Sequence, residues 1–556
     1  MGSNRKGRQI GGVRMKLDAR GILDKEQWEQ AGYKLPQFDR EQVAKNTKEN
    51  PAWIHFGGGN LFRAFQANAM QTLLNNGDAN TGLIVAEGYD YEIVEKMNHP
   101  HDDLSILVTL KADHTVEKTV IGSVVESLAL DTDNCADFSR LLEIFEKDSL
   151  QMASFTITEK GYSLTDGTGQ TISEIEEDYK NGPKAPKSYL GKVASLLYHR
   201  FISGQKPIAM VSMDNCSHNG TKLYNAMHSI ALQWAVSGLV EADFLSYIED
   251  TNKVSFPLSM IDKITPRPDP SVKEMLEKDG LEEAEPIITS KNTYVAPFVN
   301  SEECEYLVIE DVFPNGRPCL EKAGIMFTSA ETVDKVEKMK VCTCLNPLHT
   351  ALAIFGCLLD YHLISDEMKD ETLRKLVKGI GYIEGLPVVM DPGILNPKEF
   401  IDAVVGVRLP NPFMPDTPQR IATDTSQKLA IRFGETIKAY KASKELDTAD
   451  LKLIPLVFAG WLRYLMAIDD NGNPFTPSSD PLLETVQPYV ADIKLGDTIN
   501  AEQKLKPILQ NESIFGIDLY SVDMASLVCQ YFNEMITGTG AVRTTLEKYT
   551  NTITED

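Results

Sequence analysis

The chain has 556 residues, which is too many for one ordinary hydrophobic core and enough for two large domains. Its 42% hydrophobic and 24% charged residues are typical of a globular protein, and no apolar run approaches the roughly 18 residues that predict a membrane span. The net charge of −25 argues against a nucleic-acid partner, which would require a basic face. An anionic substrate would therefore have to be attracted by a local cationic pocket.

The cysteine and histidine patterns do not favour a metal site. Eight cysteines form no CxxC pair, and nine histidines show no HExxH motif. The pattern is typical of free thiols in a reducing compartment, so we expect a cytoplasmic protein that requires no metal. The polar, basic segment Met1–Arg8 is not followed by an apolar segment, which is unlike a secretory signal.

A glycine-rich turn near the start of the chain is the first candidate site. A predicted strand over 53–56 is followed by Gly57, Gly58, Gly59 and Asn60, and then by a predicted helix over 61–70. This order directs backbone N–H groups and a helix N-terminus at a pyrophosphate. Phe62 occupies the sixth position of the G-x-G-x-x-G pattern, so the motif is incomplete. An ordinary strand-to-helix turn is the alternative interpretation.

A second predicted strand, over 82–87, ends in Glu87, which follows the last glycine of the turn by 28 residues. The usual spacing in dinucleotide-binding folds is about 20. An acid at this point would accept hydrogen bonds from ribose hydroxyls and favour NAD over NADP. Asp90 is an equal candidate by charge, and for both the alternative is a solvated acid at a strand end.

The arrangement of predicted elements changes near residue 330. Up to that point strands over 106–110, 119–121, 153–158 and 207–212 alternate with helices over 135–147, 190–202 and 220–236. This alternation predicts an α/β, doubly wound, Rossmann-like domain with a mainly parallel sheet. Amphipathic helices dominate afterwards. We therefore predict an N-terminal arm over 1–50, a dinucleotide-binding domain over 51–330 and a mainly helical substrate-binding domain over 331–556.

The stretch from Lys340 to His349 is the second candidate site. It places an amine, the amide of Asn346 and an imidazole within ten residues, followed by the apolar run 351–359. A lysine next to an apolar wall can have a lowered pKa and exchange a proton near neutral pH. Such groups suit interconversion of an alcohol and a ketone. Taken alone, Lys340 would more often be a solvated helix residue, Asn346 an N-cap and His349 a histidine with satisfied hydrogen bonds.

Several segments between residues 50 and 540 together resemble the long-chain mannitol dehydrogenase family, which includes polyol dehydrogenases and hexuronate reductases. They occur in the family's order, which makes the resemblance specific. The segments are 54–67, Thr158–Tyr162, Asp214–Gly220, Ser259–Pro266, Val308–Asp311, Phe313–Pro318, Arg420–Lys428, Trp461 and Asp480–Pro481.

The resemblance implies an NAD-dependent enzyme without a metal and assigns a role to each matching residue. Lys340 would be the general acid/base, with Lys338 the alternative, and Asn215 and Asn346 would hydrogen-bond the oxygen that gains negative charge. His349 would complete the catalytic group. The substrate-binding residues would be Asp262, Lys263, Arg420 and Lys428. The cofactor-binding residues would be Phe56, Gly57, Gly58, Gly59, Asn60, Leu61, Arg63, Glu87 and Glu159.

One spacing departs from the family pattern. The family motif is K-x4-N-x2-H, whereas five residues separate Lys340 from Asn346 here. An extra residue on a regular helix would turn the amine by about 100°. Two features could absorb it: a π-bulge, or a new helix capped by Asn346 with Pro347 at its first position.

The C-L-N-P-L-H-T-A stretch resembles the fructuronate reductase branch of this family, and the chain is longer than typical polyol members. This resemblance implies reduction of D-fructuronate to D-mannonate with NADH. The alternatives are a polyol 2-dehydrogenase acting on mannitol or arabinitol, a tagaturonate reductase, and a non-catalytic cofactor-binding protein. We expect a small-molecule substrate, no nucleic-acid or membrane partner, and a monomer or small homo-oligomer.

Overall fold

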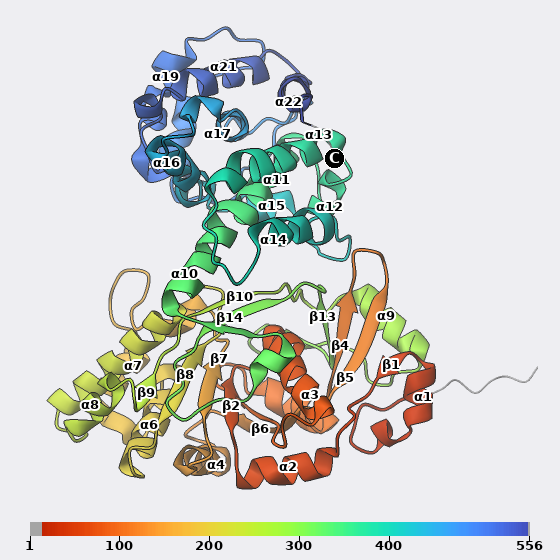
Figure 1. Cartoon of the computed structure of the whole chain (residues 1–556), viewed down its shortest axis with the longest axis vertical. Coiled ribbons are helices and arrows are strands. Elements are labelled where there is room, and N and C mark those ends of the chain that lie inside the picture. The colour runs from red at the N-terminus through yellow and green to blue at the C-terminus, as the bar shows by residue number, and fades with distance from the viewer. Residues whose placement is uncertain (1–13, 554–556) are drawn as a thin grey trace, which may run out of the picture. The chain divides into compact units, whose positions relative to one another are not determined.

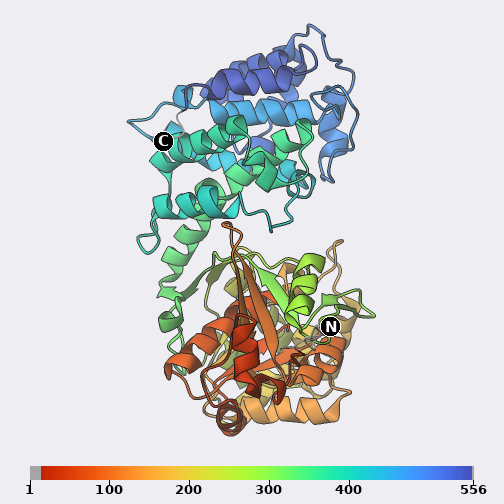
Figure 2. The ribbon, with the colours of Figure 1, turned by 90° about the vertical axis from the view of Figure 1, so that its right-hand side faces the viewer.

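The computed structural model describes residues 14–553, and the chain divides into two compact units, shown in two orientations in Figures 1 and 2. The first unit contains the chain up to Leu110 and His114–Val333, and the second contains Asp334–Asp556 with Lys111–Asp113. The predicted order, a Rossmann-like α/β domain followed by a mainly helical domain, is confirmed.

A six-stranded parallel sheet forms the centre of the first unit (Figure 1). Its strands, in spatial order, are β6 (Val124–Ala129), β3 (Leu83–Glu87), β2 (Trp53–Phe56), β7 (Met152–Phe155), β8 (Ile208–Ser212) and β9 (Val254–Ser255). Phe56 pairs with Ala86 on one side and with Phe155 on the other. The chain therefore extends the sheet in opposite directions from β2. In open α/β sheets, ligands bind outside the carboxyl ends of the strands at such a point.

Helices cover both faces of this sheet, as the doubly wound interpretation requires. Ile54 and Phe56 of β2 belong to a core that also contains residues of α4 (Cys135–Glu146), α6 (Tyr189–Ile202) and α7 (Asn219–Val236). Trp53 points to the other face and joins a core with α3 (Ala67–Asn76). The alternation follows from the two-residue period of a strand, because both faces of β2 are buried.

The predicted strands over 106–110 and 119–121 lie outside this sheet, which corrects the expectation. They form β4 (Ser105–Leu110) and β5 (Val116–Ile121), an antiparallel pair, because the short connection between them permits only a hairpin. This pair lies in a four-stranded sheet of order β1-β5-β4-β13, with β1 at Tyr33–Lys34 and β13 at Phe298–Ser301. Further strands are β10 (Ser259–Asp262), β14 (Tyr306–Glu310), β15 (Met326–Thr328), β11 (Ile287–Ile288) and β12 (Tyr294–Val295).

The described part of the predicted N-terminal arm, residues 14–50, packs as part of the first unit. It contains α1 (Lys25–Gln30), β1 and α2 (Arg40–Glu49), and β1 pairs with β5. The indole of Trp28 is fully buried against Tyr33, with ring centroids 5.1 Å apart. An aromatic pair of this size supplies enough apolar area to fix the segment.

The second unit is a helical assembly around two apolar helices, α11 (Asn346–Leu358) and α17 (Leu453–Tyr464) (Figure 1). All residues of α17 are buried. The surrounding helices include α13 (Glu371–Lys378), α14 (Pro397–Ala403), α16 (Glu435–Ala442), α21 (Ala525–Met535) and α22 (Ala541–Thr550). Helix α10 (Ala330–Met339) leads into a π-helical turn, η8 (Lys340–Cys344), and then into α11.

Within residues 14–553, the continuous helical stretch Ala330–Leu358 is long and apolar enough to cross a membrane by length and composition. Its most apolar window is 72% buried inside the structure. The core helix of a globular protein has the same properties, so this stretch is weak evidence for a membrane span.

Candidate active site

The glycine turn has the geometry that a pyrophosphate requires. Gly57 has a φ of +106°, and a Cβ there would lie 2.3 Å from the carbonyl oxygen of Thr156, so only glycine fits. A Cβ on Gly59 would meet no atom within 4 Å, which leaves open space beside the backbone. The helix begins at Asn60, immediately after the turn. Backbone N–H groups at such a helix start can bind phosphate oxygens.

Glu87 lies beside this turn at the carboxyl end of β3. Its Oε2 accepts the Gly58 N–H at 2.7 Å, and its Oε1 accepts the N–H groups of Tyr89 and Asp90 at 2.8 and 3.1 Å. Glu87 is only 5% exposed and Asp90 2%, so neither is the solvated acid of the alternative interpretation. Asp90 instead accepts a 2.5 Å hydrogen bond from the hydroxyl of Thr289.

Phe62 fits the sixth motif position because the helix widens there. The π-helical turn η2 covers Phe62–Gln66, and the Phe62 ring stacks on His55 with centroids 4.2 Å apart. A third glycine normally permits close helix–strand packing, and the wider turn removes that requirement. Arg63 donates to the Asn60 side chain at 2.9 Å and to the carbonyl of Ala296 at 2.7 Å. Arg63 and Asn60 therefore stabilise the turn.

The predicted cofactor residues Phe56, Leu61 and Glu159 lie in different settings. Phe56 is buried and stacks on Phe155 at 4.9 Å, and Leu61 lies in the first helical turn. Glu159 is mostly exposed, and its carboxylate forms an ion pair with Lys222 at 3.1 Å.

Asn215 directly follows Asp214, whose carboxylate is fixed by hydrogen bonds. The carboxylate of Asp214 accepts hydrogen bonds from the N–H groups of Ile157 and Thr158 at 2.9 and 2.8 Å, and from the hydroxyl of Tyr162 at 2.5 Å. These bonds join the segments that follow β7 and β8, and burial raises the pKa of Asp214. Asn215 itself is exposed and follows the end of β8 by three residues, at the carboxyl edge of the sheet.

Asp262 is buried at the end of β10. The ammonium of neighbouring Lys263 is 2.8 Å from the carboxylate of Glu305 and donates to the carbonyl of Glu302 at 3.1 Å. Lys263 is therefore already paired with an acid, which makes it the weakest of the predicted cations as a partner for a substrate carboxylate.

The extra residue between Lys340 and Asn346 is absorbed by a π-helical turn. The N–H of Leu345 donates to the carbonyl of Lys340 at 3.1 Å, which is the i→i+5 bond of a π-helix. The chain then bends at Leu345, and α11 begins at Asn346 with Pro347 in its first turn. Asn346 is thus the first helical residue and not the cap, so of the two alternatives the structure shows the π-helical turn, followed by a new helix with Pro347 in its first turn. Lys340 is 4% exposed.

This geometry predicts the effect of changing the length of the turn. A π-bulge is a one-residue insertion into an α-helix, so deleting Cys342 should restore an α-helical turn and keep kcat within about tenfold. Inserting one alanine after Cys342 should rotate Lys340 by about 100° and lower kcat by more than about 100-fold. Steady-state assays check both variants. Equal loss in the two would contradict this account of the turn.

His349 lies in a strongly charged environment. Its Nε2 is 3.6 Å from the carboxylate of Asp416, which also pairs with Arg420. Burial lowers the pKa of His349 to about 4; Asp416 opposes this shift, and the guanidinium groups of Arg432, Arg420 and Arg408 add to it. The imidazole is therefore neutral at pH 7 and can donate one hydrogen bond and accept one.

Because the pKa values of His55 and His349 are lowered in the folded chain, we expect acid to destabilise the fold. Burial lowers the pKa of His55 to about 3 and that of His349 to about 4, below the roughly 6.5 of an unfolded chain. The unfolded chain takes up these protons first, so the free energy of unfolding should be highest above about pH 6.5 and fall towards pH 4. Denaturant titrations at pH 5 and 7.5 measure this change. His55→Gln should make the decrease smaller, and an unchanged decrease would contradict the role of His55.

Arg420 and Lys428 do not share one regular helix. Arg420 lies in α15 (Pro418–Ile421), and Lys428 follows a separate 3₁₀ turn. The ammonium of Lys428 donates to the carbonyls of Ile421 and Thr423, and burial lowers its pKa. One turn further on, Arg432 donates to the hydroxyl of Thr350 at 2.5 Å. Sequence reasoning missed Arg432, although its i+4 spacing from Lys428 was a usable signal.

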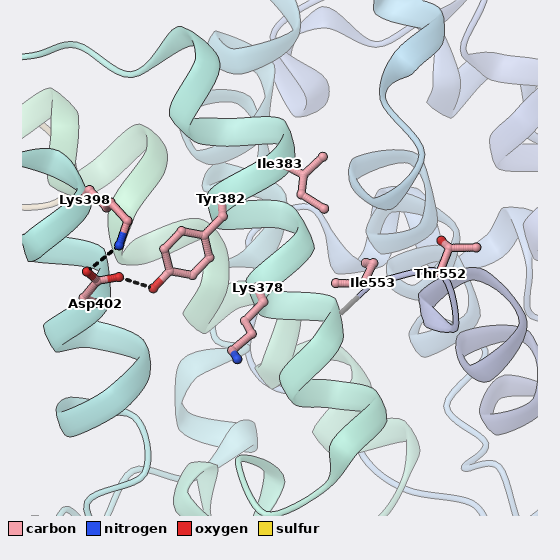
Figure 3. Close-up of a pocket in the computed structure, with 7 residues that line it drawn as sticks. All are labelled: Lys378, Tyr382, Ile383, Lys398, Asp402, Thr552 and Ile553. Carbon is pink, nitrogen blue, oxygen red and sulfur yellow. Dashed lines mark hydrogen bonds and ion pairs between the residues drawn. The ribbon is translucent and has the colours of Figure 1, made fainter. Parts of the chain in front are cut away.

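A pocket of about 430 Å³ in the second unit lies among none of these residues (Figure 3). Its lining includes Tyr382, Lys398 and Asp402, and the Tyr382 hydroxyl and the Lys398 ammonium both bind Asp402, at 2.7 and 2.8 Å. Within residues 14–553, no group of three or more His, Cys, Asp and Glu side chains is arranged to hold a metal ion.

The fold and the glycine turn are those of a dinucleotide-binding protein, and the similar proteins described below show a dehydrogenase that acts on CH–OH groups. The chain belongs to the mannitol dehydrogenase family: the model of the mannitol dehydrogenase Rossmann domain matches residues 51–322, and that of the C-terminal domain matches 332–535. The family predicted from the sequence motifs is therefore confirmed.

Two kinds of relatives stand out. A D-mannonate oxidoreductase of Thermotoga maritima is 54% identical over 536 residues, which cover 96% of this chain and 99% of the relative. The crystal structure of a D-sorbitol dehydrogenase matches with a TM-score of 0.74 and 24% identity, covering 92% of this chain and 97% of that one. Pseudomonas fluorescens mannitol 2-dehydrogenase, in a ternary complex with NAD and D-mannitol, matches with a TM-score of 0.67 and 25% identity, covering 96% and 99%.

Proposed function

We propose that the chain is an NAD-dependent oxidoreductase that reversibly reduces D-fructuronate to D-mannonate. The observation that carries this proposal is the 54% identity to a D-mannonate oxidoreductase along nearly the whole of both chains. The substrate is a small molecule, and the reaction takes place in the cytoplasm.

The first unit fits an NAD cofactor. Gly57 permits the tight turn, the space beside Gly59 admits the pyrophosphate, and Glu87 stands where the ribose hydroxyls are bound in this fold. A fixed carboxylate at this place also repels the 2′-phosphate of NADP. The bound cofactor, as NADH, supplies the hydride for C5 of the keto acid.

The residues of this chain supply the proton and hold the substrate. Lys340 donates a proton to the oxygen of the carbonyl that is reduced, and takes it back in the reverse direction. The amides of Asn215 and Asn346 donate hydrogen bonds to the same oxygen as it gains negative charge. His349, which is neutral at pH 7, binds a substrate hydroxyl.

Asp262, Arg420 and Lys428 hold the remaining substrate groups. Lys263 is a weaker candidate, because its ammonium already pairs with Glu305. The protein is a monomer or a small homo-oligomer.

A polyol 2-dehydrogenase is the second candidate, favoured by the similarity to sorbitol and mannitol dehydrogenase structures. A panel of fructuronate, tagaturonate and fructose, with NADH and NADPH, separates the candidates by the loss of absorbance at the nicotinamide band. We expect the highest kcat/KM for fructuronate with NADH. A preference for fructose would favour the polyol enzyme, and NADH binding without turnover of any of the three would favour a non-catalytic protein.

A further inference from the structure

Arg432 is a half-buried cation of the second unit that forms no ion pair with an acid of the described residues. It lies in the π-helical turn η13 (Ala430–Gly434), which packs on η8 and α11, the elements that carry Lys340 and Asn346. Within residues 14–553, Arg432 forms no ion pair with a carboxylate, and its hydrogen bond to the Thr350 hydroxyl uses one of its five N–H donors. Burying an unpaired guanidinium is costly unless an anion compensates it.

Two carboxylates of this region, Asp416 and Asp480, are engaged by other groups. Asp416 pairs with Arg420, and Asp480 accepts hydrogen bonds from the backbone and hydroxyl of Ser426. Burial lowers the pKa of Arg432 to about 10, and no acid opposes that shift. Lys428, one turn before Arg432, adds a second positive charge to this region, in a chain whose net charge is −25, whereas the charge of Arg420 is balanced by Asp416. Arg432 and Lys428 therefore give this part of an acidic chain positive charge that can attract an anion.

Hydrogen bonds connect Arg432 to the reaction site. Arg432 donates to the hydroxyl of Thr350 at 2.5 Å, and this hydroxyl donates to the carbonyl of Asn346 at 2.9 Å. In fructuronate, four carbon–carbon bonds separate the reacting carbon from the carboxylate carbon, a span of roughly 5 Å at about 1.5 Å per bond. A substrate whose reacting oxygen binds Asn346 can therefore extend its carboxylate to the free N–H groups of Arg432.

We propose that Arg432 binds the substrate carboxylate and thereby makes the site selective for hexuronates over neutral sugars. This assignment rests on the proposed function. The planar guanidinium can donate two parallel hydrogen bonds to a carboxylate, which a lysine cannot do. A neutral ketose offers no anion to this group and leaves it unpaired.

The test compares wild type with Arg432→Gln, using fructuronate and fructose at high enzyme concentration. We expect kcat/KM for fructuronate to fall by about 30-fold or more, mainly through KM, because truncating one partner of a buried charge pair has effects of this size. The value for fructose should stay within about threefold. Arg432→Lys keeps the charge without the fork and should lie between wild type and Arg432→Gln. It is measured in place of Arg432→Gln should that variant fail to fold.

Lys438→Gln is the matched control, because Lys438 is an exposed cation in the following helix, α16, that pairs with Glu435 at 2.8 Å. Lys438→Gln should leave kcat/KM unchanged for both substrates. An equal loss for fructose and fructuronate would overturn the assignment of Arg432 and leave the proposed function intact. No turnover of fructuronate by wild type would overturn both.

Discussion

Replacing Lys340 with alanine is expected to lower kcat for fructuronate reduction by about 10²- to 10⁴-fold, the usual contribution of a general acid/base. The side chain is 4% exposed and lies in the turn that leads to Asn346, so no solvent group can readily replace its ammonium. The affinity for NADH, measured by fluorescence titration, should change little, because the residues proposed to bind the cofactor lie in the first unit.

Lys338→Ala is the matched control for this experiment. Lys338 was the alternative acid/base, but its side chain is 53% exposed and pairs with Asp334 at 2.7 Å one helical turn away. Its removal should leave kcat within about twofold, as is usual for an exposed ion pair of this kind. If Lys338→Ala lost turnover while Lys340→Ala kept it, the two assignments would be exchanged. If both variants kept turnover, neither lysine would be the acid/base.

Replacing Gly57 with alanine is expected to abolish measurable NADH binding and to destabilise the first unit by about 2 kcal/mol or more. The added Cβ would lie 2.3 Å from the carbonyl oxygen of Thr156, and the φ of +106° is itself costly for a residue with a side chain. The turn must therefore move, and its N–H groups lose their alignment. Thermal unfolding and NADH titration measure the two effects.

Gly59→Ala separates binding from folding. A Cβ at Gly59 meets no atom within 4 Å, so the variant should unfold like wild type and yet bind NADH at least about tenfold more weakly, since the methyl group would occupy space needed by the pyrophosphate. Gly167→Ala, also in open space, controls for a glycine replacement outside the proposed site. Unchanged NADH affinity in Gly59→Ala would contradict the placement of the pyrophosphate.

Much of the local structure was predictable from the sequence. The strand over 53–56, its glycine turn and the following helix were expected, because a short apolar run, three glycines and a helical apolar pattern each favour one backbone conformation. The helices over 135–147 and 220–236 were also predicted to within one residue at each end, as α4 and α7. The partition of the strands into several sheets was not, because the pattern of a strand does not say which strand it pairs with.

Part of the candidate site was also predictable from the sequence, and part was not. Lys340, Asn346 and His349 are close in the sequence, so one motif was enough to select them. The extra residue before Asn346 was visible as a spacing, but whether a π-helical turn or a cap absorbed it depended on packing around Leu345. Arg432 was overlooked, because a lysine or arginine at helical spacing is usually solvated.

By itself, the sequence determined the family, the order of the two domains and the residues that carry the proposed chemistry, since these depend on side-chain identity and short-range backbone preferences. Only the tertiary structure decided the electrostatic states. It buries Glu87 against the glycine turn and holds His349 neutral beside Asp416. It also leaves Arg432 without an acid. These properties depend on burial and on charges brought together from distant parts of the chain, and no local pattern encodes them.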